Sequence, residues 1–98
     1  MTGDEIGPGS LKCVTAWSAR RPLRDLLEET LRTHVGAQEI RQLSADVFLV
    51  YTNAAASAVR DWLIPHLADE ESAFVVEFEQ WSGYGPAPDR RWLLRRGH

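Results

Sequence analysis

The sequence has only one cysteine, Cys13, among its 98 residues. One cysteine excludes an internal disulfide bond and any zinc site built from several cysteines. The three histidines, His34, His66 and His98, do not share the spacing of metal ligands. No apolar run approaches the roughly 20 residues of a membrane-spanning helix, and no signal-peptide pattern precedes the first apolar segment. We therefore expect a cytoplasmic protein with no membrane segment, no metal and no cofactor.

Catalytic motifs are missing as well. The run Gly83-Tyr84-Gly85-Pro86 is not followed by the Lys-Ser/Thr helix start of a phosphate-binding loop. The three carboxylates of residues 69–71 are consecutive, so they diverge instead of converging on a cation. Cys13 has no companion base nearby in the sequence, and Ser57 lies in no nucleophile motif. We predict no catalytic residue and favour a protein that is not an enzyme.

The segment from Asp46 to Leu67 carries the clearest structural pattern. Its apolar run Val47–Tyr51 is too short for a helix and rich in β-branched and aromatic residues, which indicates a strand buried on both faces. Thr52 and Asn53 can cap a helix that follows directly. Pro65 predicts that this helix ends or kinks at the preceding residue. The apolar residues at helical spacing are Val59, Trp62, Leu63 and Leu67.

Similar patterns predict three more strands and one more helix. The strands are predicted at Leu11–Trp17, Glu39–Leu43 and Ala73–Trp81. Pro22 suits the first position of a helix whose apolar stripe reaches Val35, and Gly36 suits its end. The order β-α-β-β-α-β is that of the ferredoxin-like α+β fold. Right-handed crossovers place both helices on one face of a four-stranded antiparallel sheet, with the first and third strands in the middle.

The opposite face of this sheet is the predicted contact surface of a homodimer. In the last strand, the apolar positions 74, 76 and 78 alternate with Val75, Glu77 and Glu79, which predicts an apolar face under the helices and an acidic face without them. Two tryptophans near the C-terminus can anchor a partner chain. We expect a mobile extension over residues 1–10, the domain over 11–81, and a C-terminal extension over 82–98 at the dimer interface. The candidate interface residues are Val75, Glu77, Glu79, Trp81 and Trp92.

The net charge of −3 is unevenly distributed. Residues 1–85 carry 7 basic and 13 acidic side chains, whereas residues 86–98 carry 4 arginines and 1 aspartate. Arginines with an interleaved aromatic residue suit phosphate contact combined with base stacking. The alternative is a solvated tail, or a tail that pairs with the acidic sheet face of a second subunit. The candidate residues for binding RNA or DNA are Arg20, Arg21, Arg90, Arg91, Trp92, Arg95 and Arg96.

Several short segments also carry a family resemblance that covers about half of the chain. The segments are the strand Val47–Thr52, Ala54-Ala55-Ala56, Val59-Arg60-Asp61, Pro65-His66-Leu67, Phe74–Glu77 and Trp92-Leu93. In them the chain resembles small prokaryotic proteins related to the CRISPR-associated spacer-integration subunit and to the VapD-like ribonuclease toxins. The resemblance implies a ferredoxin-like homodimer whose C-terminal segment contributes to the dimer, with a role near nucleic acid or toxin–antitoxin systems. Nuclease members place an aspartate at the end of the first strand, where this chain has Ala16-Trp17-Ser18, so the resemblance does not imply metal-dependent cleavage.

Three functional hypotheses follow. The first is a homodimeric binding or regulatory module without a catalytic site. The second is a nucleic-acid-binding protein or divergent ribonuclease linked to CRISPR or toxin–antitoxin systems. The third is a sensor whose small-molecule ligand lies between two subunits.

Overall fold

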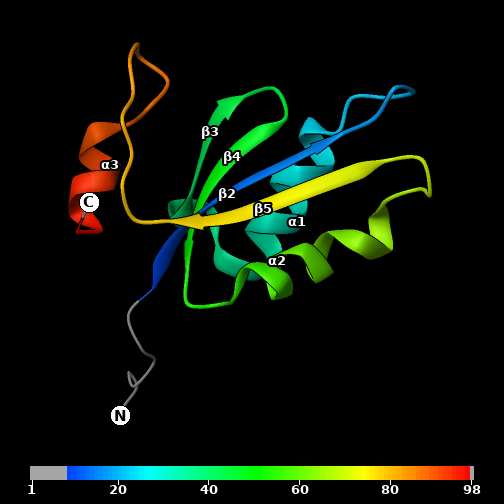
Figure 1. Cartoon of the computed structure of the whole chain (residues 1–98), viewed down its shortest axis with the longest axis horizontal. Helices are drawn as coiled ribbons and strands as arrows, with labels where there is room; N and C mark the ends of the chain where they lie inside the picture. Colours follow the sequence, from blue (N-terminus) through cyan, green and yellow to red (C-terminus); the bar gives the residue numbers. More distant parts are fainter. Residues whose placement is uncertain (1–8, 98) are drawn as a thin grey trace.

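The structure is a computed structural model, and it describes residues 9–97 (Figure 1). The first eight residues of the predicted mobile extension, and His98, lie outside the described residues. Ser10, the last residue of that predicted extension, is already part of the first described strand.

The described residues form a four-stranded antiparallel sheet in the order β3-β4-β2-β5. The strands are β2 (Ser10–Trp17), β3 (Ile40–Ser44), β4 (Val47–Thr52) and β5 (Ser72–Phe78). The helices are α1 (Arg24–Val35), α2 (Ala56–Leu63) and α3 (Arg90–Arg95), with 3-10 turns η1 (Ala37–Glu39) and η2 (Ile64–His66). The α+β class and the ferredoxin-like order predicted from the sequence are therefore confirmed. The two strands in the middle, β2 and β4, are the first and third of this motif, as expected.

Helices α1 and α2 pack against one face of the sheet and enclose the main core (Figure 1). Leu27 and Leu31 of α1 and Val59 and Leu63 of α2 are fully buried there, over side chains such as Val50 of β4. Burial of each such side chain contributes roughly 1.5–3 kcal/mol relative to its exposure. The sheet is thus held to the helices by the apolar stripes that the sequence predicted.

The ends of α1 and α2 agree with the sequence prediction, whereas the start of α2 differs from it. Gly36 ends α1 with a φ of 85°, a conformation that side chains other than glycine rarely adopt. Helix α2 begins at Ala56, not near Asn53, and Ala55 occupies its cap position without a side-chain hydrogen bond. The Thr52 hydroxyl instead accepts a hydrogen bond from the Ala54 amide at 3.1 Å, so it stabilises the turn before the helix. Helix α2 ends at Leu63 and continues as η2, which contains Pro65, as predicted.

The faces of β5 are the reverse of those predicted. Val75 pairs with Val14 and packs against the helix-covered core, and Glu77 pairs with Lys12 on the same face. Phe74 and Val76 therefore lie on the opposite face, because successive side chains of a strand alternate. The register with β2 decides this orientation, and a shift of one residue would exchange the two faces. Strand β5 also ends at Phe78, before the predicted end at Trp81.

The second face of the sheet is covered at one end, which the sequence did not predict. Trp92 and Leu93 of α3 are buried against Leu11 and Leu49, and they form a second core cluster with these residues. The segment after β5 turns back over this face, so α3 lies at one end of the sheet (Figure 1). Among residues 9–97, no helix lies over the other end of the face, beside the connections that follow β2 and precede β5 (Figure 1).

Candidate interaction surface

The part of the second sheet face that α3 leaves uncovered carries three large exposed hydrophobic side chains. Trp17 of β2 is 49% exposed, and Phe74 and Val76 of β5 are 59% and 42% exposed. Phe74 is paired with Thr15 and Val76 with Cys13, so all three hydrophobic side chains project from the same face. We call these three residues the apolar patch. Large exposed apolar side chains gathered in this way mark interaction sites more often than isolated ones do.

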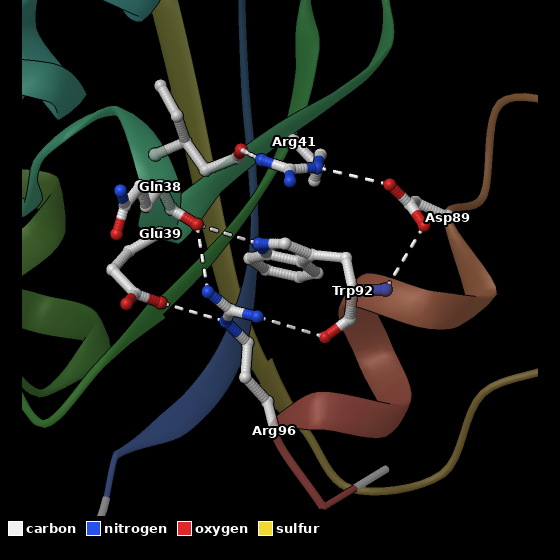
Figure 2. Close-up of polar contacts among 7 residues, drawn as sticks. Gln38, Glu39, Arg41, Asp89, Trp92 and Arg96 are labelled. Atoms are coloured by element: carbon white, nitrogen blue, oxygen red, sulfur yellow. Dashed lines mark hydrogen bonds and ion pairs between the residues drawn. The ribbon is translucent and has the colours of Figure 1, made fainter.

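The boundary of the apolar patch is set by α3, which is fixed to the sheet through Trp92 (Figure 2). The Trp92 indole is fully buried, and its Nε1 donates a hydrogen bond to the Gln38 carbonyl oxygen at 2.8 Å. The Arg96 guanidinium lies over the ring at 4.4 Å from its centroid and donates to Glu39 at 2.8 Å and to the same Gln38 carbonyl at 2.9 Å. A cation placed over an indole in this way is attracted by the negative face of the ring.

The start of α3 is fixed by Asp89. Its carboxylate accepts a hydrogen bond from the Trp92 amide at 3.0 Å and another from Arg41 Nε at 3.2 Å (Figure 2). The Trp92 amide, and then the Arg41 side chain, hold the pKa of this carboxyl below its ordinary value. Asp89 is therefore both the helix cap and the link from α3 to strand β3.

The residues predicted to bind nucleic acid do not form one surface. Trp92 is buried, so its ring is not accessible for base stacking, and Arg96 is engaged with Glu39 and Gln38. The exposed arginines of α3 are Arg90, Arg91 and Arg95. Arg20 and Arg21 belong to the connection between β2 and α1, which lies at the other end of the sheet from α3 (Figure 1). Their guanidinium groups pair with the carboxylates of Glu70 and Glu71.

The residues predicted at the interface do not form the apolar patch either. Val75 and Glu77 lie on the helix side, and Trp81 packs with the second core cluster. Trp92 is buried within the chain, and Glu79 follows the end of β5. The apolar patch was missed because the alternation in β5 identifies two faces without identifying which one is inside. Trp17 lies in the predicted first strand, but its exposure follows only from the shape of the sheet.

The end of the sheet next to the apolar patch is acidic. The connections there carry the carboxylates Asp46, Asp69, Glu70 and Glu71 against the two arginines. Glu71 accepts two hydrogen bonds from Arg21, both at 2.7 Å, and one from the Ala68 amide at 2.9 Å. The Arg21 hydrogen bonds, followed by that of the amide, lower the pKa of Glu71 to about 2.

Lys12 is a buried cation that the sequence analysis did not identify. Its side chain is 1% exposed, and Nζ lies 2.6 Å from Ser10 Oγ, 3.0 Å from the Thr52 carbonyl oxygen and 3.6 Å from a Glu77 oxygen. These contacts connect β2 with both of its neighbouring strands. Lysine is rarely buried without such partners, and here its role is to join the strand ends.

No group of three or more His, Cys, Asp or Glu side chains within the described residues 9–97 could hold a metal ion. The His34 ring stacks on Trp62 between α1 and α2 with the centroids 4.3 Å apart, and its Nδ1 lies 3.0 Å from the Thr30 carbonyl oxygen. None of the helices in this part of the chain has the length and apolar character needed to cross a membrane.

Comparisons with models of protein families, with curated proteins and with solved structures gave no match to this chain. The resemblance to spacer-integration subunits and VapD-like toxins therefore stays a prediction.

Proposed function

We propose that this chain is a binding or regulatory module without a catalytic site, and that it acts as a homodimer in which the apolar patch of each copy covers that of the other. The exposure of Trp17, Phe74 and Val76 on one sheet face is the observation that carries the proposal. Covering apolar area contributes about 25 cal/mol for each Å² removed from water. The patch is flanked by a folded segment of the same chain, so a second copy meets a preformed surface.

The position of α3 restricts how two copies can meet. Because α3 lies over one end of the sheet face, the uncovered parts of two copies can overlap only if the two α3 helices lie at opposite ends of the dimer. A two-fold axis through the patch satisfies this condition, and such axes are the most common in homodimers. Each α3 then lies beside the acidic connections of its partner.

The charges on these two regions are complementary. Residues 89–97 carry four arginines and one aspartate, a net charge of +3, and three of these arginines are exposed. The connections at the other end carry four carboxylates and two arginines, a net charge of −2. Complementary charges at the rim of an interface favour one orientation of the partners. This arrangement is our reason to choose a second copy as the occupant of the patch.

The substitution Phe74→Glu tests the dimer. It places a charge at the centre of the proposed interface, and we expect a dimer dissociation constant at least roughly tenfold higher than that of the wild type. Sedimentation equilibrium over a range of concentrations measures this constant. The matched control is Ile64→Glu, because Ile64 is 52% exposed on η2 and lies outside the patch. A wild-type chain that is monomeric throughout, or a Phe74→Glu variant that dimerises as the wild type does, would refute the proposal.

Nucleic-acid binding is the second candidate function, because the exposed Arg90, Arg91 and Arg95 are gathered on one short helix. Their affinity for a phosphate backbone would fall steeply as salt is added. Fluorescence anisotropy with single-stranded RNA and DNA at increasing salt tests this function. Binding that is lost when the three arginines are replaced by alanine would support it, whereas no binding at low salt would exclude it.

A further inference from the structure

A pocket of about 300 Å³ lies beside the apolar patch, between the sheet and the segment that leads to α3. Its floor is formed by side chains of the sheet, among them Cys13, Leu49 and Val76. Its opposite wall consists of residues that follow β5, including Trp81 and Pro88. All of these residues belong to one copy of the chain, so the pocket exists without the proposed dimer.

The wall formed by residues 81–88 is held in a compact conformation. A Cβ atom on Gly83 would lie 3.0 Å from Pro88 Cγ and 3.4 Å from the Trp81 ring, which leaves little room for a side chain there. Directly after Pro88, Asp89 is bonded to Arg41 of β3 and to the start of α3. The wall is thus anchored at one end to β5 and at the other to the sheet through α3. A pocket with fixed walls loses little conformational entropy when a ligand enters.

The lining of the pocket determines the kind of molecule that it can hold. Among the ten residues of the described chain that line it, none is charged, and the side chains with polar atoms are Cys13, Ser82 and Trp81, whose indole carries one N–H group. An ionised ligand would lose its hydration without gaining an opposite charge, which is unfavourable. The rings of Phe78 and Trp81 can instead pack against an aromatic ring. The volume is at the lower limit for small-molecule sites, which are about 300–1,000 Å³.

We propose that this pocket is a binding site for a small uncharged aromatic molecule. The ligand lies inside one subunit, in contrast to a sensor whose ligand lies between two subunits. Its position next to Val76 places it against the edge of the apolar patch.

Cys13 provides a natural reporter for the site. It is the only cysteine in the sequence, it is half-buried, and it lines the pocket. Burial raises the pKa of its thiol, which slows its reaction with alkylating reagents because the thiolate is the reactive form. A ligand in the pocket would shield it further.

The test uses 2-naphthol as the probe and 2-naphthoate as its charged counterpart with the same ring system. We expect saturable binding of 2-naphthol to the wild-type chain by calorimetry, binding of 2-naphthoate at least roughly tenfold weaker, and slower alkylation of Cys13 by iodoacetamide when 2-naphthol is bound. The variant Cys13→Phe fills the pocket and should abolish binding, whereas the matched variant Cys13→Ala should retain it.

Several results would overturn the proposal. These are the absence of saturable binding to the wild type, equal affinity for both probes, or an alkylation rate that 2-naphthol does not change. Binding that occurs only in the Phe74→Glu variant would mean that a second copy fills the pocket, and would also overturn it. If Cys13→Phe does not fold, the alkylation assay on the wild type still decides the matter.

Discussion

Trp92 is the residue on which the position of the C-terminal segment depends most. Its ring fills the space between α3 and the sheet, its Nε1 satisfies the Gln38 carbonyl, and the Arg96 guanidinium covers its outer face. In the sequence, Trp92 lies among arginines and looks like part of a binding tail. In the structure the same arginine–tryptophan pattern serves to hold α3 on the sheet.

Replacement of Trp92 should therefore lower the free energy of unfolding, and a smaller replacement side chain should lower it more. We expect Trp92→Ala to lower the free energy of unfolding by about 3–5 kcal/mol, because it leaves a large cavity in the second core cluster. Trp92→Phe keeps most of the ring, and Gln38 still accepts from Arg96, so its cost should be near 1 kcal/mol. Urea denaturation monitored by circular dichroism measures both values.

The control for this comparison is Leu94→Ala on the same helix. Leu94 is 66% exposed, so its truncation should change stability by no more than about 0.5 kcal/mol. A Trp92→Ala variant as stable as the Leu94→Ala variant would show that α3 does not stabilise the domain.

At the scale of elements, hydrogen bonds join two connections at the acidic end of the sheet, the one before α1 and the one before β5. Arg21, in the connection before α1, bonds to Glu71, in the connection before β5, and its Nη2 also donates to the His66 carbonyl at 3.0 Å. Glu71 in turn accepts from the Ala68 amide, so one carboxylate orders both connections. The start of β5, which carries Phe74, is thereby fixed relative to β2.

The hydrogen bonds between Arg21 and Glu71 predict how the stability of the fold depends on pH. The pKa of Glu71 is lowered from 4.5 to about 2, chiefly by Arg21, so its contribution to stability is complete above pH 4.5. The contribution is lost as the pH falls toward about 2, because the folded state must then bind a proton that it holds poorly. We expect Glu71→Gln to lower the Tm near neutral pH, and the difference from the wild type to shrink as the pH approaches about 2.

Thermal unfolding across this pH range measures the effect, with Glu70→Gln as the control. Glu70 pairs with the largely exposed Arg20, and such surface pairs contribute little. A Tm difference for Glu71→Gln that is the same at both ends of the range would contradict the assignment.

At the scale of the whole molecule, the charge and the apolar surface are arranged along one direction. The basic α3 lies at one end of the second sheet face, and the acidic connections lie at the other (Figure 1). The exposed side chains of the apolar patch come from β2 and β5, between these two regions. In the proposed dimer, two copies related by a two-fold axis would match each region with its complement. The proposed dimer thus depends on the distribution of charge and not on the net charge.

Replacement of Arg90, Arg91 and Arg95 by alanine tests this arrangement. Each exposed ion pair contributes about 0.2–1 kcal/mol, so we expect the dimer dissociation constant to rise roughly tenfold and its dependence on salt to become weaker. In the Phe74→Glu background, measured at concentrations below its dimer dissociation constant, the same three replacements should not change the urea unfolding midpoint. Sedimentation at low and high salt provides the measurement.

Three exposed arginines of the helix layer form the matched control, namely Arg24, Arg32 and Arg60. Their replacement removes the same charge from the other side of the molecule and should leave the dimer unchanged. An equal loss of dimer in both triple variants would show that only the net charge matters.

The sequence alone determined the order and the type of the elements in the ferredoxin-like motif. Residues 47–51 are apolar on both faces, which indicates a central strand, and the apolar stripes of α1 and α2 require a sheet to pack on. Proline and glycine marked where both helices end, because their effects on the backbone are local. These features depend on residues close together in the chain.

Only the tertiary structure decided which surface is exposed. Strand β5 has apolar side chains on both faces, so its orientation follows from its register with β2, more than fifty residues away in the sequence. Trp92 and Arg96 are engaged within the chain because α3 packs beside η1 and contacts its residue Gln38. Lys12 is buried because its side chain lies among the ends of three strands, β2, β4 and β5. The apolar patch and the pocket are formed by segments that are distant in the sequence. Local sequence patterns do not predict contacts between such segments.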